Sequence, residues 1–235
     1  MAGQSTPGSP ASSSSQLSNQ PTALQQHVLF WDQDNDGIIW PLDVYRGFRA
    51  LGFSIIFSFG GLLIPLLFSY RTRLVRSYIP DPFFRLYVSG IHNAKHTSDT
   101  GIFDVKGHFV SARFDAMFDQ FDHTNSGGLS ARELWALLKY HRSAWDPAGS
   151  SFAFMEMWTT SLLIQRDGRV SKEDLKGCYD GSLFWKIADL ETARRNGAKI
   201  KGRSQLWEKG YGIADFVQGL WQGRTWKNWE LKKDL

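Results

Sequence analysis

Acidic side chains recur at alternate positions in the segment 32–43, DQDNDGIIWPLD. This spacing is typical of the calcium-binding loop of an EF-hand, in which oxygen ligands wrap a hard cation around a tight glycine turn. The predicted ligands are the carboxylates of Asp32, Asp34, Asp36 and Asp43 and the main-chain carbonyl of Ile38, with Gly37 at the turn. We therefore predict one calcium site in this loop.

Two positions of this loop depart from the usual pattern. Trp40 stands at the ninth position and offers no side-chain oxygen, so water or a main-chain group must serve there. Asp43 stands at the twelfth position, where a longer Glu usually binds the ion through both oxygens. We expect a lower calcium affinity and competition by magnesium.

A second segment with the same spacing, 122–133, reads DHTNSGGLSARE and contains only two carboxylates, Asp122 and Glu133. Because calcium affinity follows the charge of the ligands, we predict that this loop is the structural mate of another helix–loop–helix unit and not a second tight site. Fainter copies of the unit appear in RDGRVSKEDL and GYGIADFV.

Three histidines have neighbours that suggest chemistry. His27 lies five residues before the first calcium ligand, on a predicted helix, where the residues alone allow either a core role or a metal-binding role. His92 and His96 are four residues apart, so on a helix they would share one face. The only cysteine, Cys178, forms no intramolecular disulfide and reads as a small buried thiol.

Helices must position these groups. ALQQHVLFW carries apolar residues at helical spacing from Ala23 onward, and a second helix follows Pro41, whose missing N–H is tolerated at a helix start. ARFDAMFDQF and ARELWALLKYH predict two amphipathic helices around the second loop. The predicted fold class is mainly α, with EF-hand units, one intact and the others degenerate, and an apolar hairpin.

The segment 50–70, ALGFSIIFSFGGLLIPLLFSY, contains no charged residue and is long enough to cross a bilayer as one helix. Gly60, Gly61 and Pro65 interrupt it, and arginines flank both ends, which suits a hairpin that enters lipid and returns as well as a span. A buried core helix is the third reading. We predict lipid contact, because core helices seldom run this long without a charge.

Composition divides the rest of the chain. Residues 1–22 are rich in Ser, Pro, Gly and Gln and lack the apolar run of a signal peptide, so we expect a disordered arm. We then expect an EF-hand over 23–49, the apolar hairpin and proline turn over 50–82, and a helical domain over 83–235.

Lys and Arg number 27 against 23 Asp and Glu; no recognition motif accompanies them, so we expect no nucleic-acid partner. The tryptophan-rich basic end, WQGRTWKNWELKKDL, suits a lipid interface or packing on the core.

Four pieces of the sequence, in order, resemble the caleosin family: HVLFWDQDNDGIIWPLDVYRGFRALGF, the uncharged segment, IHNAKHTSD and CYDGSLF. The resemblance covers nearly everything after Ala23. It implies a haem peroxygenase on lipid droplets and the endoplasmic reticulum; the single cysteine, Cys178, separately suggests that the chain faces the cytosol. Such an enzyme moves one oxygen from a fatty-acid hydroperoxide to an unsaturated fatty acid, giving oxylipins. The proline-rich knot of the family is reduced here to Pro65, Pro80 and Pro82.

By position, the resemblance assigns the axial ligand of haem b to His27 and a second catalytic histidine to IHNAKHTSD, either His96, which we favour, or His92. Cys178 is the other conceivable axial ligand. A single span would place His27 and His96 on opposite sides of a membrane and keep the loops 32–43 and 122–133 from pairing. We therefore predict a hairpin with both halves facing the cytosol. The alternative function is a non-enzymatic calcium-binding coat protein of lipid droplets; the oligomeric state, a homo-oligomer included, stays open.

Overall fold

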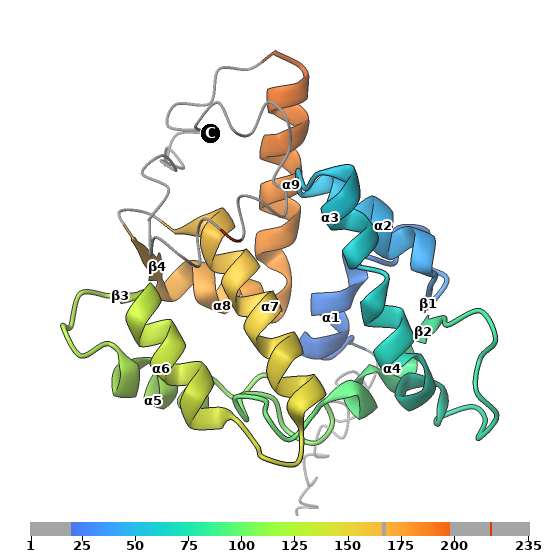
Figure 1. Cartoon of the computed structure of the whole chain (residues 1–235), viewed down its shortest axis with the longest axis horizontal. Helices are drawn as coiled ribbons and strands as arrows, with labels where there is room; N and C mark the ends of the chain where they lie inside the picture. The colour runs from blue at the N-terminus through green and yellow to red at the C-terminus, as the bar shows by residue number, and fades with distance from the viewer. Residues whose placement is uncertain (1–19, 166–167, 198–216, 218–235) are drawn as a thin grey trace, which may run out of the picture.

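Helices make up most of the part of the chain that the structure describes, which confirms the predicted mainly α fold class. The computed structural model describes residues 20–165, 168–197 and 217, so most of the predicted arm, the segment GYGIADFV apart from Val217, and the basic end lie outside the described residues. In Figure 1 the long helix α7 (Pro147–Ile164) crosses the middle of the molecule. The second helix–loop–helix unit lies on one side of α7 and the helices that follow the first loop lie on the other.

The first unit consists of α1 (Ala23–Leu29), β1 (Ile38–Ile39) and α2 (Pro41–Ala50). The hydroxyl of Thr22 accepts a hydrogen bond from the Gln25 amide, which caps the start of α1. Pro41 occupies the first turn of α2, as predicted from its missing N–H.

The apolar segment forms α3 (Ile55–Gly60) and α4 (Leu63–Arg73). The joint at 61–62 keeps right-handed helical backbone angles, so the chain continues onward there and does not reverse. By length and composition alone, Ile55–Arg73 could cross a membrane, and only 33% of its apolar window is buried.

The chain returns from the apolar segment through residues 74–85 to β2 (Leu86–Tyr87), which is followed by the 3-10 helix η1 (Val88–Ala94). β2 pairs with β1 in antiparallel register, Ile39 opposite Leu86. The two flanks of the apolar segment are therefore bonded to each other.

The rest of the described chain contains a second and a third helix–loop–helix unit, which pair with each other. The elements are α5 (Ser111–Phe121), β3 (Gly128–Ser130), α6 (Ala131–His141), β4 (Arg169–Ser171), α8 (Lys172–Asp180) and α9 (Ser182–Arg195). β3 and β4 are antiparallel, with Leu129 opposite Val170. This pair confirms that the second loop has a structural mate, in RDGRVSKEDL. The expected pairing of the first and second loops is wrong, because β1 is bonded to β2.

Two clusters of buried apolar residues form the core. The larger one gathers α5, α6, α8 and α9 with Phe30 and Phe53, and the smaller one joins Val28 and Ile39 to the elements around β2. Trp31 and Phe48 pack against both clusters. The first unit is thus fixed between the apolar segment and the paired units.

Candidate functional site

The first loop brings three of its predicted ligands together. Ligand oxygens of Asp32, Asp34 and Asp36 all lie within 4.8 Å of one another. Gly37 adopts a positive φ of 78°, which the tight turn requires. One oxygen of the buried Asp32 accepts a hydrogen bond from the Gly37 amide at 3.0 Å, and the other is buried without a partner. An orphaned, buried carboxylate oxygen that faces two more carboxylates fits a bound cation.

Electrostatics in this loop also favour a cation. Burial raises the pKa of Asp32, and the hydrogen bond from Gly37 is not enough to offset burial together with the neighbouring Asp34 and Asp36. Like charges at short range disfavour ionisation of a carboxylate. A divalent ion among the three side chains would reverse this effect, so the loop is built to hold one.

Asp43 does not join the other three carboxylates. One of its oxygens accepts a hydrogen bond from the Trp40 amide at 3.0 Å, and the other lies 3.4 Å from Arg46. Asp43 therefore caps α2 in this arrangement, and its role as a ligand remains a prediction. Ile38 lies in β1 beside the turn, and its carbonyl likewise remains a predicted ligand.

His27 is held at both ring nitrogens. Its Nδ1 lies 2.8 Å from the carbonyl oxygen of Cys178, and its Nε2 lies 3.4 Å from a carboxylate oxygen of Glu156 on α7. The edge of the imidazole also meets the ring of Phe184. With Nδ1–H donating to the carbonyl, Nε2 is the nitrogen left to bind a metal, which is the usual arrangement for a metal-binding histidine.

Burial acts to lower the pKa of His27, but Glu156, through a hydrogen bond and through its charge, raises it overall with help from the carbonyls of Cys178 and Tyr179. Cys178 offers a poor alternative to His27 as a metal ligand. Its thiol is buried, and burial together with the charge of Glu156 raises its pKa, which disfavours the thiolate that binds iron.

His96 and His92 are placed differently from each other. η1 ends at Ala94, so His96 lies beyond the helix, and the expected shared face of the two histidines is wrong. His96 is largely buried, with Nδ1 3.2 Å from Asp146, the N-cap of α7, and its ring edge toward Phe152. His92 lies on η1 and is half-buried.

Helix α7 is the element that the two candidate histidines share. Glu156 meets His27 and Phe152 meets His96, and these two residues lie one turn apart on α7. Sequence analysis missed Glu156, Asp146 and the Cys178 carbonyl. No local pattern marks them, although the N-cap position of Asp146 before Pro147 was readable.

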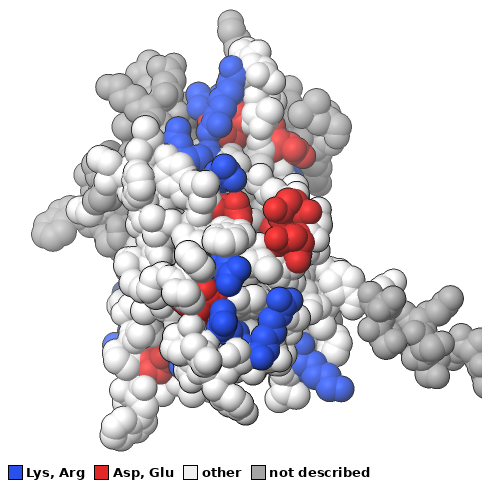
Figure 2. Space-filling view, turned by 90° about the vertical axis from the view of Figure 1, so that its right-hand side faces the viewer, with Lys and Arg blue, Asp and Glu red and all other residues white. Residues whose placement is uncertain are grey.

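A broad apolar surface flanks this region. Figure 2 looks onto the side that carries α2–α4, where uncharged residues dominate and basic residues gather beside them. The exposed apolar side chains of α3 and α4 are Ile55, Ile56, Phe59, Leu63, Leu66, Leu67 and Tyr70, and those of the return segment are Leu74, Val75, Tyr78, Ile79, Phe83 and Phe84. We call this set the apolar face. An area of this extent marks an interaction site.

Comparison with known proteins gives consistent results. A family model described as caleosin related protein matches residues 19–188. A peroxygenase from Lilium longiflorum is 38% identical over 182 residues, which cover 76% of this chain and 74% of the relative. Probable peroxygenase 4 from Arabidopsis thaliana is 34% identical over 173 residues, 73% of this chain and 88% of the relative. A probable inactive peroxygenase-like protein from Arabidopsis thaliana is 29% identical over 163 residues, 68% of this chain and 75% of the relative. No solved structure matches the chain.

Proposed function

Since this chain belongs to the caleosin family and is an oxidoreductase of the calcium-binding peroxygenase type, we propose that it uses haem b, held by His27, to transfer one oxygen from a fatty-acid hydroperoxide to an unsaturated fatty acid. The observation that carries the proposal is the placement of His27. Its Nδ1 is engaged by the Cys178 carbonyl, and its Nε2 is directed at Glu156 on α7, one turn from Phe152, which the ring of His96 meets.

The donor chemistry of His27 fits an axial ligand. The hydrogen bond from Nδ1 to the Cys178 carbonyl fixes the tautomer of His27 and makes Nε2 the better metal ligand. Glu156 lies at the border of the site and is partly exposed, so its carboxylate has room to move away from Nε2. When bound, haem supplies the capacity to cleave the O–O bond of a peroxide.

His96 is suited to moving a proton at the peroxide. Its Nδ1 lies beside the Asp146 carboxylate. Burial acts to raise the pKa of Asp146, but hydrogen bonds from the Gly149 amide and from the amide and hydroxyl of Ser98, together with the charge of His96, lower it overall. The Asp146 carboxylate can orient the imidazole of His96, as is usual for a histidine that moves a proton in catalysis. His92 is the alternative for this role.

Calcium would act through α1. Asp32, the first ligand, comes three residues after the last residue of α1, and its amide donates to the Leu29 carbonyl. An ion that fixes Asp32 therefore also fixes the end of the helix that carries His27. This coupling predicts that removal of calcium weakens haem retention.

The apolar face supports a seat on a lipid monolayer. Because β1 pairs with β2, the chain on either side of the apolar segment stays together, which supports entry and return over a span. The basic residues that Figure 2 shows on this side suit anionic headgroups. We place the protein on lipid droplets and the endoplasmic reticulum, facing the cytosol, where its lipid substrates reside; a homo-oligomer there is compatible with this arrangement.

An absorption spectrum of the full chain, purified in detergent with haem supplied, tests the proposal. We expect a Soret band that is lost in His27→Ala, persists in His141→Ala, a histidine on α6, and weakens in EDTA. Addition of a fatty-acid hydroperoxide and an unsaturated fatty acid should then yield the epoxide or alcohol. A Soret band of equal strength in His27→Ala would contradict the assignment of the ligand.

A calcium-binding structural protein of lipid droplets is the second candidate. The relative named probable inactive peroxygenase-like protein favours it, and so does the contact of His27 with Glu156, which satisfies the imidazole without iron. Absence of stoichiometric haem and of oxygen transfer, with calcium binding intact, would establish this second function.

A further inference from the structure

The second loop, 122–133, is closed on itself by hydrogen bonds. One oxygen of Asp122, at the first position, accepts hydrogen bonds from the Thr124 hydroxyl and from the amide and hydroxyl of Ser126. The other oxygen accepts the Gly127 amide at 2.8 Å. The loop therefore keeps the shape of an EF-hand loop although it has lost carboxylates.

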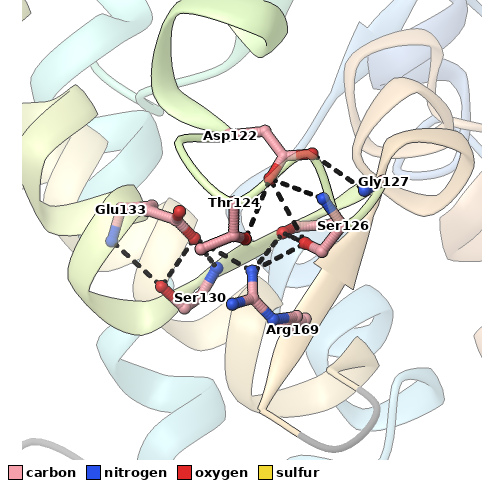
Figure 3. Close-up of polar contacts among 8 residues, drawn as sticks. Asp122, Thr124, Ser126, Gly127, Ser130, Glu133 and Arg169 are labelled. Carbon is pink, nitrogen blue, oxygen red and sulfur yellow. Dashed lines mark hydrogen bonds and ion pairs between the residues drawn. The ribbon is translucent and has the colours of Figure 1, made fainter.

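A positive charge from the paired unit enters this loop. Arg169, the first residue of β4, lies opposite Ser130 in the β3–β4 pair. Its Nη1 donates to the Ser126 hydroxyl at 2.8 Å and to the Gly128 carbonyl at 2.8 Å, and it lies 3.2 Å from a carboxylate oxygen of Glu133. Figure 3 shows the guanidinium pointing into the ring of loop oxygens.

The three oxygens that Arg169 contacts come from particular loop positions. Ser126 holds the fifth position, Gly128 the seventh and Glu133 the twelfth, counted from Asp122. An EF-hand draws calcium ligands from these same positions: a side chain at five, a carbonyl at seven and an acid at twelve. Three of the ligand positions of a calcium loop are therefore already in contact with one cation here.

We propose that the guanidinium of Arg169 replaces calcium in the loop 122–133, so that the paired units hold an ion-loaded shape without binding an ion. Glu133 is 7% exposed, and a buried carboxylate needs a partner of opposite charge. Arg169 supplies that charge from within the chain, and it is fixed there by the strand pairing.

The first loop shows the opposite condition. Among the described residues, no ion pair involves the cluster of Asp32, Asp34 and Asp36, and the nearby Arg46 pairs with Asp43, outside that cluster. The first loop therefore depends on an external ion and the second does not. We infer that calcium changes the order of the first unit while the paired units remain unaffected.

Calcium titration of the full chain by calorimetry tests this inference. The double variant Asp34→Ala/Asp36→Ala removes two ligands of the first loop, because alanine offers no side-chain oxygen, so calcium still bound would report the second loop. With Arg169 present we expect no binding up to ~1 mM free calcium. Binding of one calcium per chain by this variant would overturn the proposal.

A matched set of variants in the same background isolates the guanidinium. Ser126→Asp restores the carboxylate that the fifth position usually provides. We expect Ser126→Asp/Arg169→Ala to bind calcium at least ~10-fold more tightly than Ser126→Asp alone, because the latter retains the internal cation. Arg132→Ala removes an exposed charge next to Glu133 without opening the loop and should leave the affinity of Ser126→Asp unchanged. Equal affinities with and without Arg169 would refute the replacement.

Hydrogen–deuterium exchange on the unsubstituted chain tests whether the second loop responds to calcium, and it does so even if Arg169→Ala does not fold. Amides of 122–133 should exchange at the same rate in calcium and in EDTA, whereas amides of 32–43 should be slowed by calcium. Protection of the second loop that depends on calcium would overturn the proposal.

Discussion

Asp81 is a buried charge on which the return from the apolar segment depends. Its carboxylate accepts hydrogen bonds from the Tyr87 hydroxyl at 2.6 Å and from Arg85 and the Phe83 amide at 2.9 Å, and it pairs with Arg73 at 3.0 Å. Burial acts to raise the pKa of Asp81, but these hydrogen bonds and the charge of Arg85 lower it to about 2. The network ties residues 74–85 to both α4 and β2.

Asp81→Asn should destabilise the protein in a pH-dependent way. Because the pKa of Asp81 is lower in the folded chain, its contribution is fully present above the unfolded pKa near 4 and is lost as the pH falls toward 2. The shift corresponds to about 2 kcal/mol of unfolding free energy at pH 7. Urea denaturation in detergent should give that difference between wild type and variant at pH 7 and a smaller one at pH 3. Asp189→Asn, at an exposed residue of α9, should cost much less, and a difference for Asp81→Asn that is independent of pH would contradict the role of its charge.

Single residues were predictable where their partners are local. The cluster of Asp32, Asp34 and Asp36 followed from spacing alone, because the loop folds its own ligands together. The carbonyl partner of His27 lies 151 residues away in the sequence, and no pattern in either segment indicates the other. The local sequence around Arg169 does not indicate its role in the second loop, because its reach into that loop depends on the strand opposite.

At the scale of elements, helix α1 is seated directly on the turn between α8 and α9. Gly181, in this turn, has a φ of 82°, and a Cβ at this position would lie 2.6 Å from the Cα of His27 and 2.8 Å from the Gln26 carbonyl oxygen. Only glycine allows both the backbone angle and the close approach. The turn thereby sets the distance of the helix that carries the proposed iron ligand.

Gly181→Ala should move α1 away from α8 and destabilise the protein by about 2–4 kcal/mol, the sum of a left-handed alanine and an overpacked contact. Gly197→Ala is the matched control, because Gly197 has a similar φ of 90° but no atom within 4 Å of the added Cβ; we expect about 1 kcal/mol there. Urea denaturation measures both. A cost for Gly181→Ala no larger than that of the control would show that α1 is not seated by this turn.

Helices were easier to predict than their pairing. The periodicity of Ser111–Phe121 and Ala131–His141 is local and was read directly. The strand Leu86–Tyr87 carries no EF-hand pattern, so the sequence does not predict that this strand pairs with the first loop. η1 ends at Ala94 and leaves His96 outside the helix, although the sequence to that point is compatible with a longer one.

At the scale of the whole molecule, the apolar face and the paired units have different roles. The apolar face is presented by α3, α4 and the return segment, and the larger core cluster holds the paired units behind it. The lack of charge in the apolar segment predicts contact with lipid, but it leaves the orientation of the segment open. Exposed side chains along both helices provide that orientation.

Charges placed on the apolar face should abolish lipid binding without unfolding the protein. Phe59→Asp/Leu66→Asp changes two exposed side chains, and a charge in hydrocarbon costs about 3 kcal/mol each. We expect at least a ~100-fold loss of binding to phospholipid-coated triolein droplets in flotation, with an unchanged urea midpoint. Val105→Asp, at an exposed apolar residue outside the face, should float like wild type. Equal flotation of the double variant would show that another surface binds lipid.

The bonding of β1 to β2 makes the calcium loop and the apolar segment thermodynamically linked. The carbonyl of Gly37, at the turn of the loop, accepts a hydrogen bond from the amide of Val88 just after β2, so an ion that orders the loop also orders the closure of the apolar segment. Linkage is reciprocal: if calcium strengthens droplet binding by some factor, droplets strengthen calcium binding by the same factor. The first loop, with the short Asp43 at its twelfth position, would then reach its full calcium affinity only when the apolar segment is bound to lipid. The lipid monolayer would in this way contribute to calcium binding.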